Sequence, residues 1–364
     1  MNLLSRLSAA VLFALGCVLC SCGAGAGVPT AGHTSHTPAV GPAYAHRADV
    51  MAQTTDMAQR HGLDRRWVRK VVGRAHYIPS VVKLIAPPPP GVAKNWRAYR
   101  DRFIEPLRIQ AGVKFWQRHA DALERAERDY GVPAEVIVGV IGVETFYGQQ
   151  TGTYRVLDAL ATLAFDFPKT HPRAQERGAY FKSELEQFLL LNRYAGTDPA
   201  TQKGSYAGAM GLAQFMPSSW LKYAVDFDGD GKTDLVNSAV DVIGSVANYF
   251  RIFNWQSGMP AYYAVRFDTA TLDLDALLAP DILPTFSVAS FQAKGAVLEG
   301  DALQHKGPLA LIELQNGDPL LEGNAPTYVA GTENFYAITR YNWSSYYAMA
   351  VLDLGHAVAA ARQP

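Results

Sequence analysis

Glu144 is the residue whose place in the chain most clearly suggests chemistry. Its segment, Gly131–Gly148, is typical of a helix, because Pro133 suits the first helical position and the last glycine suits a stop. Three apolar residues, Ile137, Val140 and Ile141, recur there at helical spacing. The next position on the same face of the helix is Glu144. Since burial disfavours a charged carboxylate, the pKa of Glu144 should be raised. We therefore expect a general acid that donates a proton near neutral pH, for example to a glycosidic oxygen; the alternative is a buried structural carboxylate paired with Arg or Lys.

A second group of polar residues lies in a run of small and apolar ones. Ser205 and Gln214 belong to the segment Lys203–Trp220, whose glycines at positions 204, 208 and 211 permit close approach of another element or of a sugar ring. The segment is therefore a candidate wall of a binding cleft. Its alternative interpretation is a tightly packed helix pair with two satisfied polar residues.

The segment Asp226–Asp241 has the spacing of a cation-binding loop. Three carboxylates stand at its positions one, three and five, namely Asp226, Asp228 and Asp230, and Lys232 can offer its carbonyl at position seven. Like charges this close repel one another unless a cation neutralises them, and oxygen ligands favour Ca²⁺. Asn237 replaces the usual glutamate at position twelve. We expect a structural calcium site, the alternative being an acidic turn without metal.

Composition allows a sizeable globular protein and argues against a nucleic-acid partner. The 364 residues are 49% hydrophobic and 18% charged, enough for two or three packed subdomains. Thirty-three basic and thirty-three acidic residues cancel. The protein therefore has no net positive charge that would attract nucleic acid.

The first twenty-two residues are predicted to be a targeting segment. Arg6 precedes the apolar run Leu7–Leu19, which is short for a membrane span. Cys22 follows in a lipobox-like pattern and would become the lipidated N-terminus, whereas the alternative is an ordinary signal peptide cut near residues 24–26. Gly23, rather than Asp, follows this cysteine, which resembles the sequence of Gram-negative lipoproteins that are sorted to the outer membrane. All three cysteines lie in this segment, so we expect no disulfide in the folded domain.

The remaining chain changes in character from helical to β and back. A small and Pro-rich stretch, 23–45, is predicted to be a flexible linker. Helical patterns cover Asp49–Gly62, Asp64–Gly73, most of Asn95–Tyr130, the Gly-interrupted stretch 131–256 and Ser344–Arg362. Strands of a small antiparallel sheet are expected at Tyr262–Phe267, Leu309–Leu314, Tyr328–Ala330 and Phe335–Thr339.

Taken together, these segments resemble the lysozyme-like lytic transglycosylases, and within them the membrane-bound lytic murein transglycosylase B family. The matching stretches follow one another in order through most of the mature chain: Gly139–Gly148, Val156–Leu163, Tyr180–Leu190, Gly204–Ser219, Tyr223–Phe227, Ile243–Phe250 and Thr339–Val351. One such motif can agree by chance, whereas seven in sequence are specific.

The resemblance implies an α+β fold, mainly α, with a lysozyme-like catalytic core, a flanking helical domain and a small antiparallel β domain. The expected boundaries are 1–22 for the signal peptide, 23–45 for the linker, 46–130 for the helical domain, 131–258 for the catalytic core with the calcium-type loop, 259–340 for the β domain and 341–364 for a C-terminal helix packing on the helical domain.

Residues that match the family's motifs acquire implied roles. Glu144 is implied as the single catalytic acid and base, and Asp241 as the ligand that closes the calcium loop, which is one residue longer here. Residues implied to line the cleft are Tyr99, Ser205, Gln214, Tyr249, Tyr341, Asn342 and Tyr347. Aromatic faces stack on sugar rings, and amides and hydroxyls bind acetamido oxygens. The alternative for Tyr249 and Tyr347 is a place in the core.

The implied reaction cleaves the MurNAc–GlcNAc β-1,4 bond of peptidoglycan with formation of 1,6-anhydro-N-acetylmuramic acid. Asp158 and Asp166 are weaker candidates for a catalytic carboxyl, because their segments are typical of packing or of a turn. The alternatives are a hydrolytic muramidase and an inactive calcium-dependent peptidoglycan-binding lipoprotein. We expect no cofactor for catalysis and a structural Ca²⁺. The expected partners are glycan strands, outer-membrane lipid at the periplasmic face of a Gram-negative bacterium and other cell-wall enzymes, but no nucleic acid.

Overall fold

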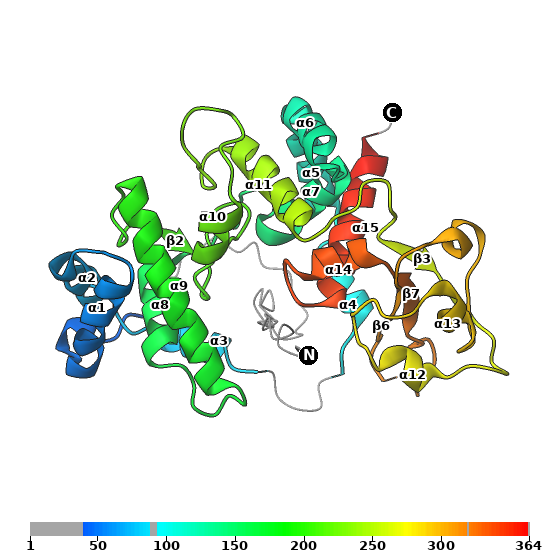
Figure 1. Ribbon diagram of the computed structural model, residues 1–364, viewed down its shortest axis with the longest axis horizontal. Coiled ribbons are helices and arrows are strands. Elements are labelled where there is room, and N and C mark those ends of the chain that lie inside the picture. Colours follow the sequence, from blue (N-terminus) through cyan, green and yellow to red (C-terminus); the bar gives the residue numbers. More distant parts are fainter. Residues whose placement is uncertain (1–38, 88–92, 319, 363–364) are drawn as a thin grey trace, which may run out of the picture.

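Helices dominate the structure, a computed structural model that describes residues 39–87, 93–318 and 320–362. The buried apolar side chains gather in three clusters, two among helices and one beside small antiparallel sheets. Figure 1 shows most of the helices at the left and centre and the strands β3, β6 and β7 together at the right. The expected α+β class, mainly α, is confirmed. The predicted signal peptide, Cys22 and most of the predicted linker lie outside the described residues.

The first helical cluster joins the N-terminal helices to a helical pair from the middle of the chain. Val68, Leu160 and Phe181 are among its buried residues. Its elements are η1 (Tyr44–His46), α1 (Ala48–Arg60), α2 (Arg65–Gly73), α3 (Pro79–Leu84), α8 (Val156–Phe165), α9 (Ala174–Ala195), α10 (Pro217–Tyr223) and the short ladder of β1 (Tyr154–Arg155) with β2 (Lys203–Gly204).

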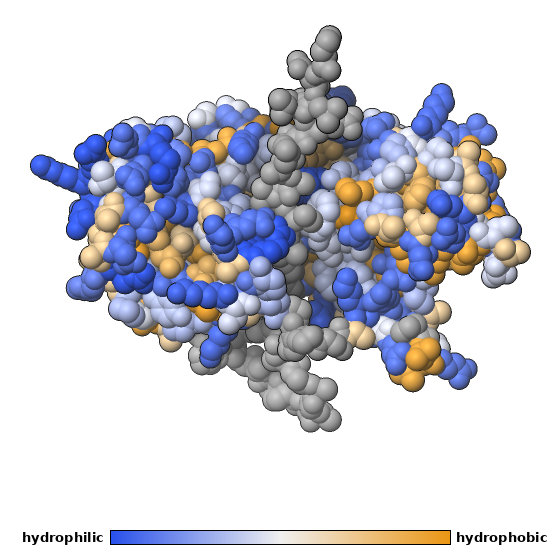
Figure 2. All heavy atoms as spheres, turned by 60° about the horizontal axis from the view of Figure 1, so that its bottom comes forward, coloured by the Kyte–Doolittle hydropathy of each residue, from blue (hydrophilic) through white to orange (hydrophobic). Residues whose placement is uncertain are grey.

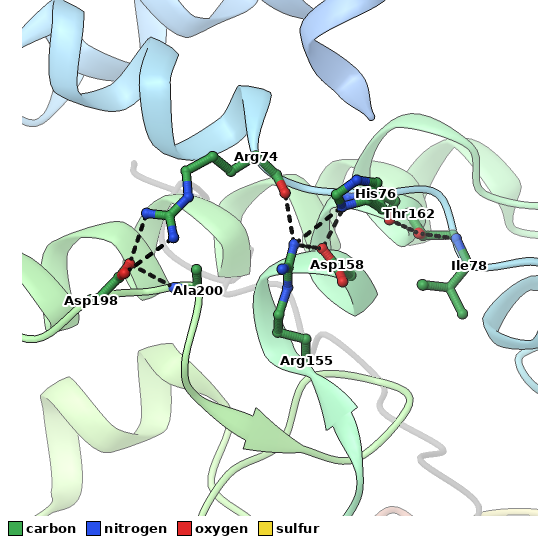
Figure 3. Close-up of polar contacts among 8 residues, drawn as sticks. All are labelled: Arg74, His76, Ile78, Arg155, Asp158, Thr162, Asp198 and Ala200. Carbon is green, nitrogen blue, oxygen red and sulfur yellow. Dashed lines mark hydrogen bonds and ion pairs between the residues drawn. The ribbon is translucent and has the colours of Figure 1, made fainter. Parts of the chain in front are cut away.

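A polar joint fixes the segment after α2 against the start of α8 (Figure 3). Asp158 accepts hydrogen bonds from the His76 backbone N–H at 2.9 Å and from Arg155 at 2.6 Å. Asp166, at the other end of α8, accepts from the Tyr44 hydroxyl at 2.5 Å and pairs with Arg47 at 3.0 Å. Both carboxylates therefore join elements of the fold, as their segments suggested.

The second helical cluster is built around a close crossing of two buried helices. Gly139 of α7 and Gly355 of α15 each face the other helix's backbone, since an added Cβ would lie 2.2 Å from the Val351 carbonyl oxygen and 2.3 Å from that of Glu135, respectively. The elements of this cluster are α4 (Trp96–Arg100), α5 (Pro106–Arg118), α6 (Ala120–Tyr130), α7 (Ala134–Thr145), α11 (Ala239–Ile252), α14 (Glu333–Thr339) and α15 (Ser345–Ala361).

The third cluster lies beside a three-stranded antiparallel sheet of order β3-β7-β6. Its elements are β3 (Tyr262–Ala264), β4 (Arg266–Phe267), α12 (Leu274–Leu278), α13 (Val288–Gln292), β5 (Ala296–Val297), η2 (Gly300–Gln304), β6 (Ala310–Leu314) and β7 (Thr327–Gly331). The strand expected at Phe335–Thr339 is wrong, because these residues lie in α14. Thr332 caps this helix by accepting the Asn334 N–H at 3.1 Å, and short apolar runs do not separate buried helix from strand by periodicity.

Packing groups the helices differently from the boundaries expected along the sequence. Helices α5 and α6, from the predicted segment 46–130, pack on α7 and α11 of the predicted catalytic core, and α15 packs mainly on α7 and α5. On the face shown in Figure 2, hydrophilic residues predominate and hydrophobic residues form several separate groups. None of the helices within the described ranges combines the length and hydropathy needed to cross a membrane.

Candidate active site

Glu144 stands in the last turn of α7, at the edge of a helix that is otherwise almost entirely buried. Every residue from Val136 to Val143 is buried, whereas Glu144 is half-buried. The sequence predicts that one face of α7 is buried, whereas the structure buries nearly all of its residues, because other helices surround α7. Glu144 therefore lies where this buried helix meets partly exposed chain.

The helix ends at Thr145, earlier than the predicted stop at Gly148, in an unusual turn. Phe146 and Tyr147 both adopt left-handed backbone conformations, with φ of 50° and 56°. The Arg108 guanidinium lies 4.4 Å from the Phe146 ring centre and donates to the Gly142 carbonyl at 2.7 Å. These contacts hold a strained turn directly after Glu144.

The carboxyl group of Glu144 is hydrogen-bonded to a tyrosine from the opposite end of the chain. The Tyr347 hydroxyl donates to Glu144 Oε1 at 2.6 Å, and Tyr347 is completely buried in α15. Burial raises the pKa of Glu144 to about 7, although the hydrogen bond from Tyr347 opposes this rise. Near neutral pH the group can therefore exist both as an acid and as a base.

Three of the implied aromatic residues form a row that ends at this carboxyl group. The ring centres of Tyr249 and Tyr341 are 4.8 Å apart, and those of Tyr341 and Tyr347 are 6.3 Å apart and nearly parallel. Tyr249 and Tyr347 are buried, as the alternative interpretation held, whereas Tyr341 is half-buried. The structure thus places α11, the segment after α14 and α15 around Glu144.

The glycine-rich segment closes against the end of α7 as a loop and not as a helix pair. Thr145 Oγ1 donates to the Leu212 carbonyl at 2.9 Å, and the Tyr341 hydroxyl donates to the Ala213 carbonyl at 2.6 Å. Gln214 donates to the Gly211 carbonyl at 2.9 Å, while Ser205 Oγ accepts the Ala209 N–H at 3.0 Å. Both predicted polar residues are half-buried and help to hold the loop in shape.

Tyr99 and Asn342 occupy different positions relative to the row. Asn342 follows Tyr341 and is buried. Tyr99, from α4, packs at 5.3 Å from Phe103 and at 5.8 Å from Tyr346, which directly precedes Tyr347. Residues 96–103 therefore pack on α15 beside the residue that precedes Tyr347, and their link to the site is indirect.

The acidic loop brings its first three carboxylates together at the surface. One oxygen from each of Asp226, Asp228 and Asp230 lies within 4.8 Å of the others, and all three residues are exposed. Asp226 also accepts the backbone N–H groups of residues 229, 230 and 231, which curls the loop around it. Three convergent carboxylate oxygens fit a hard cation such as Ca²⁺.

Asp241, the implied closing ligand, is buried at the base of this loop. Its Oδ1 accepts the N–H groups of Phe227 at 2.7 Å and Asp228 at 3.2 Å, and its Oδ2 accepts that of Asp234 at 2.8 Å. Lys232 is exposed at the rim. Asp241 therefore ties both sides of the loop to the start of α11, on which Tyr249 stands.

Two residues that support the site gave little signal in the sequence. Thr145 follows Glu144 directly and has the pattern of an ordinary residue in an apolar helix, although its hydroxyl also accepts the Gly148 N–H at 3.1 Å. Arg108 is buried, and an arginine in a helical pattern ordinarily points to solvent. The Arg108 pairing with Gly142 depends on how α5 packs on α7.

Comparisons with known proteins agree over nearly the whole described chain. The Transglycosylase SLT domain family matches residues 46–356. The membrane-bound lytic murein transglycosylase B of Escherichia coli (strain K12) is 41% identical over 332 residues, which cover 89% of this chain and 86% of that protein.

Solved structures match as well. The Escherichia coli lytic transglycosylase SLT35 in complex with bulgecin A has a TM-score of 0.77 at 41% identity, covering 89% of this chain and 96% of its own. Its complex with calcium has a TM-score of 0.76 at 40% identity, with the same two coverages. Pseudomonas aeruginosa SltB3 in complex with NAG-anhNAM-pentapeptide has a TM-score of 0.68 at 27% identity, covering 84% of this chain and 78% of its own.

Proposed function

Because the chain belongs to the transglycosylase SLT family and is a lytic murein transglycosylase, an enzyme that cleaves peptidoglycan, we propose that Glu144 alone supplies its acid and its base. The reaction cleaves the β-1,4 bond between MurNAc and GlcNAc and leaves a 1,6-anhydro ring on the muramic residue. The observation that carries this proposal is a half-buried carboxyl group whose pKa is about 7 and which is held by Tyr347.

Two proton transfers by the same carboxyl group complete the reaction. Protonated Glu144 gives its proton to the glycosidic oxygen, the bond from C1 to that oxygen breaks, and GlcNAc leaves with a hydroxyl group. The neighbouring acetamido group stabilises the positive charge at C1. The Glu144 carboxylate then takes the proton of the C6 hydroxyl, whose oxygen bonds to C1 without consuming water. One group can serve in both steps because its pKa lies near the working pH.

The half-buried end of the tyrosine row at Tyr341 and the glycine-rich loop form the glycan-binding surface of this proposal. Aromatic faces pack on sugar C–H groups, and half-buried polar side chains bind acetamido and hydroxyl groups. Tyr99, Ser205, Gln214 and Tyr341 are half-buried and would contact the glycan, whereas Tyr249, Asn342 and Tyr347 are buried and would support this surface from behind. Their support is the chain of contacts that ends at Glu144.

Analysis of products from purified sacculi tests the reaction type. We expect soluble muropeptides that contain anhydro-muramic acid, detected by mass spectrometry. Products heavier by one water would instead identify a hydrolytic muramidase. Glycan binding without soluble products would identify an inactive binding protein.

The acidic loop serves as a structural calcium site in this proposal. Asp226, Asp228 and Asp230 would hold Ca²⁺ together with the Lys232 carbonyl, and Asp241 would close the loop. The support is the convergence of three carboxylates and the calcium complex of the related SLT35. Bound Ca²⁺ would neutralise the loop and stabilise the start of α11.

Lipid attachment at Cys22 would place the enzyme at the periplasmic face of the outer membrane. Its support is the lipobox-like sequence and the name of the relative, which is membrane-bound. Labelling with a fatty acid in cells should mark the wild type, and Cys22→Ala should abolish the label. Label retained on the alanine variant would rule out this site.

A further inference from the structure

Arg340 sits among aromatic rings at the edge of the glycan-binding surface. Its guanidinium carbon lies 5.3 Å from the ring centre of Phe253, 5.9 Å from that of Tyr336 and 5.6 Å from that of Trp343. The Tyr336 and Trp343 rings meet edge to face at 5.9 Å. All four residues are half-buried, and we call them the Arg340 platform.

The guanidinium of Arg340 has no acidic partner among the described residues. Arg108 and Arg125 also contact rings, but both donate to backbone carbonyls. The Arg340 side chain makes no hydrogen bond or ion pair with any described residue, and none of its nitrogen atoms is buried. Its central carbon therefore lies near three aromatic rings while its N–H groups reach solvent, which leaves the donor fork available to an anion.

The Arg340 platform continues the tyrosine row away from Glu144. The Tyr249 hydroxyl donates to the Arg340 carbonyl at 2.5 Å, and the Phe253 ring lies 4.5 Å from that of Tyr249. Arg340 also directly precedes Tyr341 in the chain. In Figure 1 the end of α11, α14 and the connection into α15 lie together. A glycan that contacts Tyr341, the half-buried member of the row, beside Glu144 would therefore bring its substituents near this positive charge.

We propose that Arg340 binds a carboxylate of the muropeptide and so makes the enzyme prefer charged peptidoglycan over neutral chitin-like chains. The inference rests on the proposed function. An intact strand offers carboxylates on its stem peptides, whereas a strand without peptides offers the lactyl carboxylate of muramic acid. A planar guanidinium whose position is fixed by neighbouring rings is preorganised for bidentate pairing with either carboxylate.

Binding measurements in the inactive Glu144→Gln background test the inference separately from turnover. Three ligands are compared by calorimetry: peptide-bearing glycan fragments, the same fragments after amidase treatment, and neutral chito-oligosaccharides of equal length. Arg340→Met should weaken binding of a carboxylate-bearing ligand by about 10- to 100-fold, the usual range for a charge-assisted hydrogen bond, and leave the neutral ligand unchanged. If only the peptide-bearing ligand binds more weakly to the variant, the carboxylate that Arg340 binds belongs to the stem peptide. If the weakening persists after amidase treatment, this carboxylate is the lactyl group of muramic acid.

Controls separate recognition of charge from packing. Arg362 lies 4.1 Å over the Trp116 ring at the far end of α15, so Arg362→Met removes a similar stacked cation and should change none of the affinities. Arg340→Lys keeps the positive charge but lacks the forked N–H donors, so it should lose less affinity for carboxylate-bearing ligands than Arg340→Met does. Equal weakening for charged and neutral ligands, or no weakening for either, overturns the inference. Wild type that releases no soluble products from sacculi would reject the proposed reaction, but the affinities would still decide the role of Arg340.

Discussion

The end of α7 and the acidic loop place carboxyl groups in opposite environments. Glu144 is a single half-buried group whose hydrogen-bond partner lies 203 residues away in sequence. Asp226, Asp228 and Asp230 are exposed, and their hydrogen-bond partners, backbone N–H groups and the Ser238 hydroxyl, all lie within ten residues of them in the chain. Tertiary packing raises the proton affinity of the first group, whereas the geometry of the three local carboxylates fits a cation.

The difference shows that the environment of a carboxyl group decides its chemistry more than its type does. Burial raises the pKa of Glu144 to about 7, because the charged form loses water that the protein does not replace. Glu184 of α9 is more deeply buried, but the Ser218 N–H and hydroxyl bind it at 2.9 and 2.6 Å. Burial raises the pKa of Glu184 too, and these hydrogen bonds lower it. Glu184 is therefore a matched structural control for Glu144.

Removing the proton of Glu144 should have the largest effect on activity. Glu144→Gln keeps the size of the side chain, and we expect release of soluble muropeptides from sacculi to fall by about 10³-fold or more, since one group performs both proton transfers. The melting temperature should not decrease. A folded variant that keeps most of its activity would remove Glu144 from the mechanism.

The control for this experiment is Glu184→Gln. An amide cannot accept both Ser218 hydrogen bonds as the carboxylate does, so the variant should lose about 1–3 kcal/mol of unfolding free energy. Its activity at a temperature where it is folded should remain close to that of the wild type. Loss of activity equal to that of Glu144→Gln would contradict the contrast between the two glutamates.

Tyr347→Phe tests the hydrogen bond that modulates the acid. This bond stabilises the carboxylate, so its removal should raise the pKa of Glu144 further. Because the protonated form starts the reaction, activity should fall as pH rises through the pKa, near 7 in the wild type and higher in the variant. We expect about a tenfold loss of kcat at the optimum, from poorer positioning of the acid. A pH profile that moves down or stays in place would refute the role of Tyr347.

The acidic loop should respond to calcium in a way that the end of α7 does not. Calcium at about one hundred times its Kd should stabilise the protein by about 2.7 kcal/mol, read as a rise in melting temperature that EGTA reverses. Asp226→Asn should reduce this rise. Asp241→Asn should also destabilise the calcium-free protein, because its carboxylate accepts three backbone N–H groups. No calcium response in the wild type would reject the site.

The raised pKa of Glu144 should also appear in the pH dependence of stability. The unfolded group titrates near 4.5 and the folded group near 7, so between these values the folded state binds more protons. The free energy of unfolding should therefore fall as pH rises from 4.5 to 7, by at most about 3 kcal/mol from this group. Glu144→Gln should lack this part of the fall, as measured by urea unfolding across the pH range. Parallel curves for the two proteins would show that Glu144 has an ordinary pKa.

The sequence was sufficient for features that depend on nearby residues. The spacing of Asp226, Asp228 and Asp230 predicts three neighbouring carboxylates in one loop, and the structure brings their oxygens together, because all three lie within five positions of the chain. Capping and periodicity likewise predict α1, α2 and α15 to within about two residues at each end. Periodicity failed at Phe335–Thr339, where a short apolar run fits a helix and a strand equally well.

Tertiary structure decided what surrounds Glu144. The helical spacing of apolar residues predicts that Glu144 lies on a buried face, whereas the structure places it at a partly exposed edge of α7. The pairing with Tyr347 requires the close crossing of α7 and α15 at Gly139, and the turn after Glu144 requires Arg108 from α5. Such contacts depend on which helices meet and at what distance. These distances are set by the packing of side chains far apart in the sequence, so local patterns cannot specify them.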